Sequence, residues 1–330
     1  MKVAIFSSKP FEKKYLIAAN KTTSHELFFF DEALNERTVA LAKDFSAVCC
    51  FVTDHINAEV INQLQKQGVK LIALRTAGFN HVDISAAKKA GLTVVRVPAY
   101  SPHSVAEFTV GLILALNRKI PQAYNRVREH NFLLDGLLGF DLKGKTVGVV
   151  GTGKIGSVFA KIMCGFECNV IGFDPVQNKD LIQLGIKYVS FEELCKKSDI
   201  ISLHCPLNAQ THHIINAQAL SLMQSNVMLI NTGRGALIDT TAVIENLKNN
   251  KIGYLGLDVY EEEDNLFFQD LSHMRLKDEV FIRLQTFPNV LITGHQAFFT
   301  EEALTNIAKT TLNNIRDFEK SQLDVSSVVS

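Results

Sequence analysis

The chain has 330 residues, 47% of them hydrophobic, and it carries 34 Lys plus Arg against 34 Asp plus Glu. This length exceeds what one hydrophobic core usually supports, so we expect two domains. The formal net charge of zero argues against a nucleic-acid binder and favours an enzyme that acts on a small molecule.

The sequence shows no sign of export or of membrane insertion. The apolar run near Met1 is too short for a signal peptide, and no later segment reaches the length of a membrane span. The six cysteines include no CxxC pair, which suits a reducing compartment. Cys164 and Cys168 lie four residues apart, but no histidine stands at ligand spacing, so they are predicted to be small core residues. We therefore expect a cytoplasmic protein without a metal site.

Short apolar runs alternate with helix-like segments through the first hundred residues. The runs lie at 3–7, 47–52, 71–75 and 93–97. This alternation predicts βαβ units whose parallel strands are buried on both faces. Ser104 and Glu107 then match a capping box, so a long helix should start there. Further along, Pro121 should end or kink the helical pattern that follows this start. The first domain boundary is placed near residue 100.

The second half of the chain repeats this alternation more strongly. Apolar runs occur at 146–151, 169–174, 199–204, 226–231, 252–258 and 289–294. Six such runs predict a doubly wound parallel sheet of Rossmann type. After residue 298 the pattern is helical again.

A glycine-rich turn follows the first of these runs. Gly151, Gly153 and Gly156 form a GxGxxG motif between a predicted strand and a predicted helix. Such glycines allow a tight turn, close approach of a pyrophosphate and close packing of helix on strand. Asp174 ends the next run, where its carboxylate can bind ribose hydroxyls and repel a 2′-phosphate. The motif therefore predicts NAD as the cofactor.

Polar residues follow several of the other runs at their carboxyl ends. Arg234 follows 226–231, the acidic cluster 261–263 follows 252–258, and His295 follows 289–294. In an open parallel sheet these ends share one edge with the glycine-rich turn, and ligands bind there. An arginine can bind a carboxylate bidentately, and a histidine backed by a carboxylate can donate a proton. This set suits reduction of a 2-oxo acid.

Other polar residues near this edge have plainer interpretations. His204, next to the glycine-rich turn, is predicted to line the NAD pocket. Cys205 has no nearby base and is expected to be a pocket wall rather than a nucleophile. His212 and His213 show neither metal-like spacing nor an acidic partner, so we expect a solvated loop.

The motifs LKGKTVGVVGTGKIG, HCPL, NTGRGALID, GLDVYEEE and TGHQAF together resemble the D-isomer-specific 2-hydroxyacid dehydrogenases. Within that family, segments 75–83, 96–107 and 264–270 resemble the bacterial fermentative D-lactate dehydrogenases. The resemblance covers essentially the whole chain, with several motifs in order, which makes it far more specific than one fingerprint.

This resemblance implies an α/β protein of two doubly wound parallel-sheet domains. A Rossmann NAD-binding domain, 101–298, would be inserted in a flavodoxin-like substrate domain formed by 1–100 and 299–330. The implied activity is NAD-dependent interconversion of pyruvate and D-lactate. A bulkier 2-oxo acid as substrate, and a non-enzymic NAD-sensing co-repressor, are the alternatives. The implied assembly is a homodimer or homotetramer formed through the helical region 104–130, with no nucleic-acid or membrane partner.

The resemblance also assigns roles to single residues. Arg234 matches the arginine that binds the substrate carboxylate, His295 matches the acid/base, and Glu263 matches the glutamate that supports the histidine. Residues matching NAD-contacting positions, besides the glycines, are Lys154, Ile155, Asp174, Cys205, Pro206, Thr211, Thr232, Gly233 and, near the nicotinamide, Asp258. Ala77, Gly78 and Tyr100 match the substrate site. Family members often carry a tyrosine where this chain has Phe298 and Phe299, a difference expected to affect the choice among short 2-oxo acids.

Overall fold

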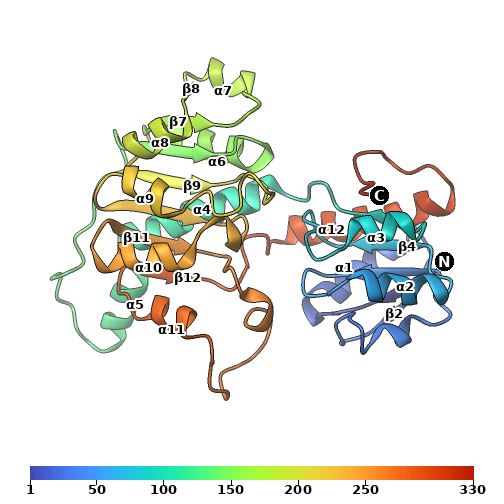
Figure 1. Ribbon diagram of the computed structural model, residues 1–330. Helices are drawn as coiled ribbons and strands as arrows, with labels where there is room; N and C mark the ends of the chain where they lie inside the picture. Colours follow the sequence, from blue (N-terminus) through green and yellow to red (C-terminus); the bar gives the residue numbers. More distant parts are fainter. The chain divides into compact units, whose positions relative to one another are not determined.

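The computed structural model describes the backbone of residues 1–330 and every side chain except that of Asn265. The chain forms two compact units (Figure 1). Unit 1 comprises Met1–Ser101 and Phe299–Ser330, and unit 2 comprises Pro102–Phe298. Unit 1 is therefore built from two separate stretches of the chain, and unit 2 from one.

Unit 1 contains a five-stranded parallel sheet. Its strands are β1 (Lys2–Ile5), β2 (Glu26–Phe29), β3 (Ala47–Cys50), β4 (Leu71–Leu74) and β5 (Thr93–Val95). They lie in the order β2-β1-β3-β4-β5, with every neighbouring pair parallel. This is the order of a flavodoxin-like sheet.

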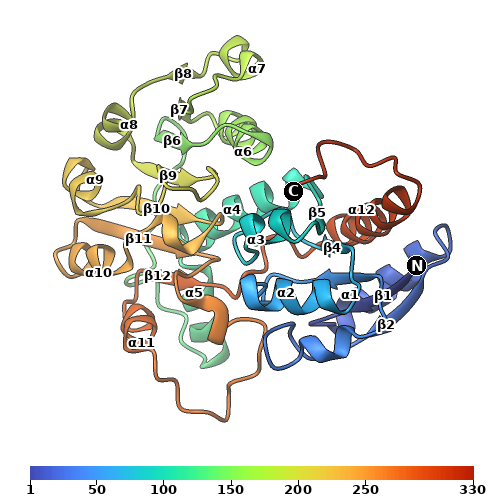
Figure 2. The same cartoon turned by 45° about the vertical axis from the view of Figure 1, so that its right-hand side comes forward.

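Helices cover both faces of the sheet in unit 1. They are α1 (Pro10–Asn20), η1 (Val39–Ala42), α2 (Ala58–Lys66), α3 (Ile84–Lys89) and α12 (Glu301–Glu319). One face packs against α2, α3 and η1, and the other against α1 and α12. Figures 1 and 2 both show the red helix α12 among the blue elements from the start of the chain. Because both faces are covered, β3 and β4 are buried at every position.

Unit 2 contains a seven-stranded parallel sheet. Its strands are β6 (Thr146–Val150), β7 (Asn169–Phe173), β8 (Lys187–Tyr188), β9 (Ile200–Leu203), β10 (Val227–Asn231), β11 (Ile252–Leu257) and β12 (Val290–Ile292). Their order is β12-β11-β10-β9-β6-β7-β8. The order reverses between β6 and β9, which makes this edge the topological switch point of a Rossmann sheet. The predicted fold class is confirmed in both units.

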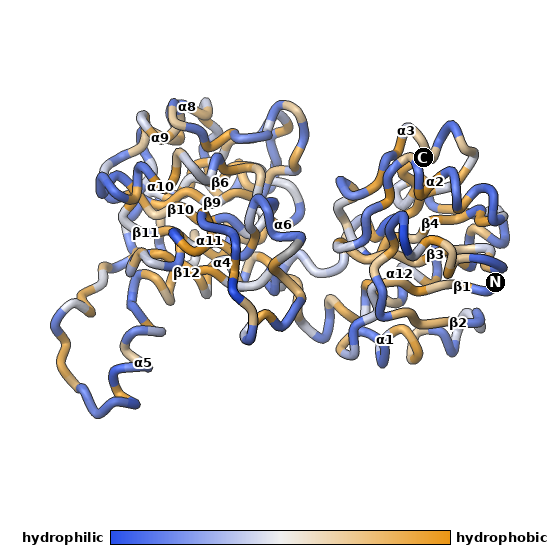
Figure 3. The backbone as a smooth tube through the Cα atoms, turned by 60° about the horizontal axis from the view of Figure 1, so that its bottom comes forward, coloured by the Kyte–Doolittle hydropathy of each residue, from blue (hydrophilic) through white to orange (hydrophobic). Residues whose placement is uncertain are grey.

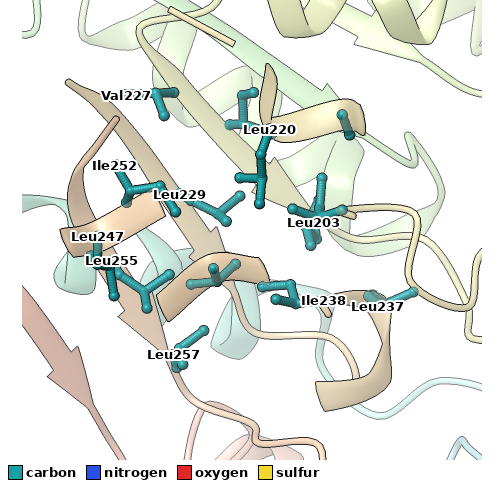
Figure 4. Close-up of a cluster of buried hydrophobic side chains, with 14 of the residues drawn as sticks. Leu203, Leu220, Val227, Leu229, Leu237, Ile238, Leu247, Ile252, Leu255 and Leu257 are labelled. Carbon is teal, nitrogen blue, oxygen red and sulfur yellow. The ribbon is translucent and has the colours of Figure 1, made fainter. Parts of the chain in front are cut away.

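The helices of unit 2 also form two layers. They are α4 (Pro102–Asn117), α5 (Ile120–Arg128), α6 (Lys154–Gly165), α7 (Lys179–Gln183), α8 (Phe191–Lys197), α9 (Ala217–Leu222), η2 (Gly235–Leu237), α10 (Thr240–Lys248), η3 (Glu263–Asn265) and α11 (Glu279–Gln285). Helices α4, α6 and α7 bury one face of the sheet, and α8 to α11 bury the other. The strands run largely hydrophobic in Figure 3. In Figure 4, Leu229 and Leu255 of the sheet lie among the side chains of this second core.

The first helix of unit 2 begins earlier than the sequence suggested. Helix α4 starts at Pro102, so Ser104 lies inside it and is buried, and the expected capping box is wrong. Proline suits the first position because it has a helical φ and no N–H to leave unpaired. Pro121 likewise lies in the first turn of α5 rather than ending a helix. Among the described residues, no helix is both long and apolar enough to cross a membrane.

Candidate active site

The glycine-rich turn joins β6 to α6. Gly151 has a φ of 92°, which favours glycine, and a β-carbon at Gly156 would lie 1.9 Å from the Gly151 carbonyl oxygen. A β-carbon at Gly153 would meet nothing within 4 Å, so the backbone there is open. Helix α6 starts at the next residue and points its free N–H groups at this space. The turn therefore fits a pyrophosphate.

Asp174 stands beside this turn at the end of β7. Its Oδ2 accepts a hydrogen bond from the Thr152 N–H at 2.7 Å, and its Oδ1 accepts one from the Val176 N–H at 2.8 Å. The Thr152 hydroxyl also lies 2.7 Å from the hydroxyl of Tyr188, a contact that the sequence did not suggest. These bonds fix the carboxylate beside the glycine-rich turn, where its remaining lone pairs can accept hydrogen bonds from ribose hydroxyls.

The end of β9 packs against the glycine-rich turn. A β-carbon at Gly151 would lie 2.5 Å from the backbone nitrogen of Cys205. His204 lies with its Nε2 2.9 Å from the Ser202 hydroxyl and its ring 5.0 Å from that of Phe159. Burial lowers the pKa of His204 to about 3, so its imidazole is neutral near pH 7. Burial raises the pKa of Cys205 to about 11, which keeps it a thiol and makes it a poor nucleophile.

The other residues matched to cofactor positions lie near the same edge. Lys154 is the exposed first residue of α6, and Ile155 packs on the core beneath it. The Thr211 hydroxyl donates to the Pro206 carbonyl at 2.6 Å and closes the loop after β9. Their contact with a cofactor stays a prediction.

Arg234 lies in a loop fixed by Asn231 at the end of β10. The Asn231 side chain donates to the Arg234 carbonyl at 2.8 Å and accepts from the Gly233 N–H at 3.0 Å. The Thr232 hydroxyl lies 2.9 Å from that of Thr109 on α4. The Arg234 guanidinium donates to the Gly233 carbonyl at 2.8 Å, which occupies one of its five N–H donors. The loop thus presents a half-buried cation at the strand end.

The turn after β11 packs directly against this arginine loop. A β-carbon at Gly235 would lie 2.1 Å from the backbone of Tyr260, so only glycine allows the contact. Within the turn, Glu263 accepts from the Tyr260 N–H at 2.9 Å through Oε2, and its Oε1 lies 2.8 Å from His295 Nδ1. The side chains of Glu263 and His295 are each 16% exposed. The geometry therefore leaves His295 Nε2 as the ring nitrogen that can serve a ligand.

Asp258 holds the segment that carries His295. The Asp258 carboxylate accepts from the Thr293 hydroxyl at 2.6 Å and from the N–H groups of Gln296 and Ala297 at 2.9 and 2.8 Å. Its carbonyl accepts from the His295 N–H at 2.7 Å. Burial raises the pKa of Asp258, and these hydrogen bonds oppose the rise. Asp258 is 0% exposed and thus holds this segment in place, and its expected contact with the cofactor stays a prediction.

Two aromatic rings flank the histidine. The ring centroid of Phe268 lies 5.6 Å from that of His295, and the ring of Phe298 lies 6.4 Å away at 87°. Sequence reasoning singled out Phe298 but not Phe268. The only signal for Phe268 is its place in the segment 264–270, one of the segments that carry the family resemblance.

One expectation about histidines is wrong. His213 was expected to lie in a solvated loop without an acidic partner, but its Nε2 pairs with Glu261 Oε1. Glu261 stands 48 residues further along the chain, so local spacing could not reveal the pair.

The residues matched to the substrate site belong to unit 1. Ala77 and Gly78 follow β4, and their carbonyls accept from the Arg96 guanidinium at 2.9 Å and the Thr76 hydroxyl at 2.6 Å. The Tyr100 carbonyl accepts from the Asn306 side chain at 2.7 Å. The loop 76–78 and Tyr100 are thus held by defined hydrogen bonds within their own unit, and their contact with substrate stays a prediction.

Comparisons with known proteins agree with this geometry. Residues 110–297 match the family model of the D-isomer specific 2-hydroxyacid dehydrogenase, NAD binding domain. D-lactate dehydrogenase of Escherichia coli is 51% identical over 322 residues, covering 98% of each chain. The apo-structure of D-lactate dehydrogenase from E. coli superposes with a TM-score of 0.90 at 48% identity and covers 100% of both chains. D-lactate dehydrogenase from Aquifex aeolicus, complexed with NAD and lactic acid, has a TM-score of 0.88 at 34% identity, over 99% of each. The chain therefore belongs to the D-isomer specific 2-hydroxyacid dehydrogenase family.

Proposed function

We propose that the protein is an NAD-dependent D-lactate dehydrogenase that interconverts pyruvate plus NADH and D-lactate plus NAD. The Glu263–His295 pair carries this proposal, because it backs a ring nitrogen with a carboxylate on the edge that also holds the glycine-rich turn. The loop of Arg234 packs, through Gly235, against the turn after β11 that carries Glu263. The D-lactate dehydrogenase relatives support the choice of substrate.

Each of the three side chains has one task in this reaction. Arg234 binds the pyruvate carboxylate through paired N–H donors, which orients the neighbouring ketone. NADH, when bound, supplies the hydride. His295 donates the proton from Nε2 to the ketone oxygen, while Glu263 accepts the Nδ1–H and stabilises the imidazolium. In the reverse direction the neutral imidazole takes the hydroxyl proton back.

The aromatic rings beside His295 support a short substrate. Phe268 and Phe298 stand within 6.4 Å of the imidazole, centroid to centroid, so we expect them to limit the room for a branched or aromatic side chain. Apolar rings at this place would also limit the access of water to the site of proton transfer, which would strengthen the charged contacts there. A methyl group, as in pyruvate, needs the least room.

The test is NADH oxidation with a panel of 2-oxo acids, followed by chiral analysis of the product. We expect the highest catalytic efficiency with pyruvate and D-lactate as its product. Higher efficiency with 4-methyl-2-oxopentanoate or phenylpyruvate would instead support a dehydrogenase for a bulkier acid. Tight NADH binding with no turnover of any of them would support an NAD-sensing protein.

We also infer the roles of the two units. Unit 2 would bind NAD through the glycine-rich turn and Asp174, and unit 1 would contribute Ala77, Gly78 and Tyr100 to substrate binding. Alanine at Tyr100 should then raise the KM for pyruvate and leave the dissociation constant of NADH unchanged. Weakened NADH binding in that variant would contradict this division.

The family assignment also supports an expectation for the assembly and the location. We expect a cytoplasmic homodimer or homotetramer whose contact surface includes α5 and the segment after it, where large apolar side chains are exposed: Ile120, Tyr124, Val127, Phe132, Leu133, Leu134 and Leu138. Light scattering during gel filtration tests the assembly, and aspartate at Leu134, which is 81% exposed, should dissociate it. A monomeric parent protein would contradict the expectation.

A further inference from the structure

A cluster of three metal-ligating side chains lies outside the catalytic set. His212, His213 and Glu261 each offer one ligand atom, and these atoms all lie within 4.8 Å of one another. His212 is exposed, and the side chains of His213 and Glu261 are 32% and 22% exposed. We propose that these three residues form a binding site for a divalent transition-metal cation of the Zn²⁺ class.

The chain holds the two histidines side by side against Glu261. His213 has a φ of 50°, a left-handed conformation that costs a non-glycine residue roughly 1–2 kcal/mol. Backbone bonds hold it there: its N–H donates to the Ala236 carbonyl at 2.8 Å, and the Ile215 N–H donates to the Leu237 carbonyl at 3.1 Å. In this conformation the rings of His212 and His213 stack at 4.0 Å. The backbone thus holds the two imidazole rings beside Glu261.

The distances suit insertion of a cation. Ligand atoms at about 2.0–2.1 Å from a tetrahedral Zn²⁺ lie about 3.3 Å apart. His213 Nε2 and Glu261 Oε1 are now in direct hydrogen-bond contact and would need to separate by less than an ångström. His212, being exposed, can bring its ring nitrogen in by side-chain rotation. Water would complete the coordination on the exposed side, as in other sites with three protein ligands.

The second oxygen of Glu261 is already oriented. Glu261 Oε2 accepts from the Thr240 hydroxyl at 3.0 Å, which leaves Oε1 to face the histidines. Hydrogen bonds of this kind to a ligating carboxylate commonly orient it toward the metal. Two imidazoles with one carboxylate favour Zn²⁺ and its neighbours in the first transition row over Mg²⁺ or Ca²⁺, which prefer oxygen ligands.

Replacing His212 distinguishes a metal site from a purely structural role of the His213–Glu261 pair. The pair ties the loop after β9 to the turn after β11 whether or not a metal binds. Removing the His212 ring leaves that tie intact but removes one ligand. The variant His212→Ala is therefore the main test, Glu261→Gln the second, and His55→Ala, an exposed histidine of unit 1, the matched control.

The experiment is calorimetric titration of metal-free, tag-free, reduced protein with Zn²⁺, and with Co²⁺ for its absorption spectrum. We expect one Zn²⁺ per chain, affinity lowered at least about tenfold in His212→Ala and in Glu261→Gln, and no change in His55→Ala. Dehydrogenase activity in chelator should be the same in His212→Ala as in the parent. Co²⁺ should give visible bands of nitrogen and oxygen ligation.

Three results would overturn the proposal. The first is absence of Zn²⁺ binding by the parent protein. The second is equal affinity in the parent and His212→Ala. The third is a near-ultraviolet thiolate band with Co²⁺, which would assign the metal to cysteines, six of which are free in the chain.

Discussion

The glycines at 153 and 156 should separate the stability of the glycine-rich turn from its ligand binding. In Gly156→Ala the new β-carbon would lie 1.9 Å from the Gly151 oxygen, whereas real β-carbons essentially never come closer than 3.0 Å. The turn must therefore open by at least 1.1 Å, the difference between these values. Strain of this kind costs about 1–3 kcal/mol and should lower the melting temperature by several degrees.

Alanine at position 153 should have the opposite profile. Its β-carbon would meet nothing within 4 Å, so the cofactor-free fold should lose only about 0.5–1 kcal/mol, the difference between glycine and alanine at the N-cap of a helix. The same β-carbon would stand where the pyrophosphate approaches the backbone. Displacing the ligand at a cost of about 2 kcal/mol corresponds to NADH affinity about thirtyfold weaker.

The assay pairs thermal unfolding without cofactor with fluorescence titration of NADH. Gly165→Ala is the matched control, because Gly165 lies at the other end of α6 and is equally open. It should leave NADH binding unchanged. If Gly153→Ala bound NADH as tightly as the parent, the pyrophosphate would not lie over this backbone and the reasoning would be refuted.

Four further predictions concern the proposed reaction and the cofactor edge. His295→Ala should lower turnover by orders of magnitude and leave NADH binding nearly intact; near-normal turnover would remove His295 from the mechanism. Arg234→Lys should raise KM for pyruvate and lower kcat together, because lysine lacks the bidentate geometry, and unchanged kcat/KM would contradict the carboxylate contact. Glu263→Gln should lower kcat for pyruvate reduction, because an amide stabilises the charged imidazole ring less than a carboxylate does, whereas Glu262→Gln, at an exposed position, should keep the parent kcat; the reverse result would assign the role to Glu262. Burial lowers the pKa of His204 from 6.5 to about 3 in the folded protein. Between pH 6.5 and pH 3 the imidazole is therefore protonated only in the unfolded chain, and the free energy of unfolding falls as the pH falls. The free energy of unfolding should fall by about 2 kcal/mol between pH 7 and pH 5 because of this group. Urea unfolding at the two pH values should therefore show a smaller fall for His204→Gln than for the parent protein. An equal fall in both proteins would show that His204 is not the cause.

Much of the fold could be predicted because parallel strands buried on both faces are apolar throughout. Every such run became a strand, whereas the edge strands β2 and β8 were missed. Alternate residues of β2 are exposed, and β8 has only two residues, so neither leaves a continuous apolar run. The continuous apolar run is thus absent from the edge strands β2 and β8, although the edge strands β5 and β12 have one.

The site could be predicted only as far as strand ends reveal it. Sheet topology placed Arg234, the acidic cluster and His295 at one edge, but only the family pattern chose Glu263 among three neighbouring glutamates. The hydrogen-bond partners of Asp258 could not be foreseen, because they lie in residues 293–297, which follow a different strand. Pairings across loops depend on tertiary packing, which local spacing does not encode.

The division of unit 1 between two stretches of chain has a consequence for protein synthesis. Helices α1 and α12 share one face of the sheet formed by β1 to β5, and the last residues pair with β5 through the Val94 and Val329 N–H groups. On the ribosome, the 197 residues from 102 to 298 separate these parts. At about 5–20 residues per second they take about 10–40 s to emerge. We expect the first five strands to wait that long with the part of one apolar face that α12 covers still exposed, while unit 2 is already complete enough to fold. Nascent unit 1 is therefore the part of the chain that most needs protection from aggregation.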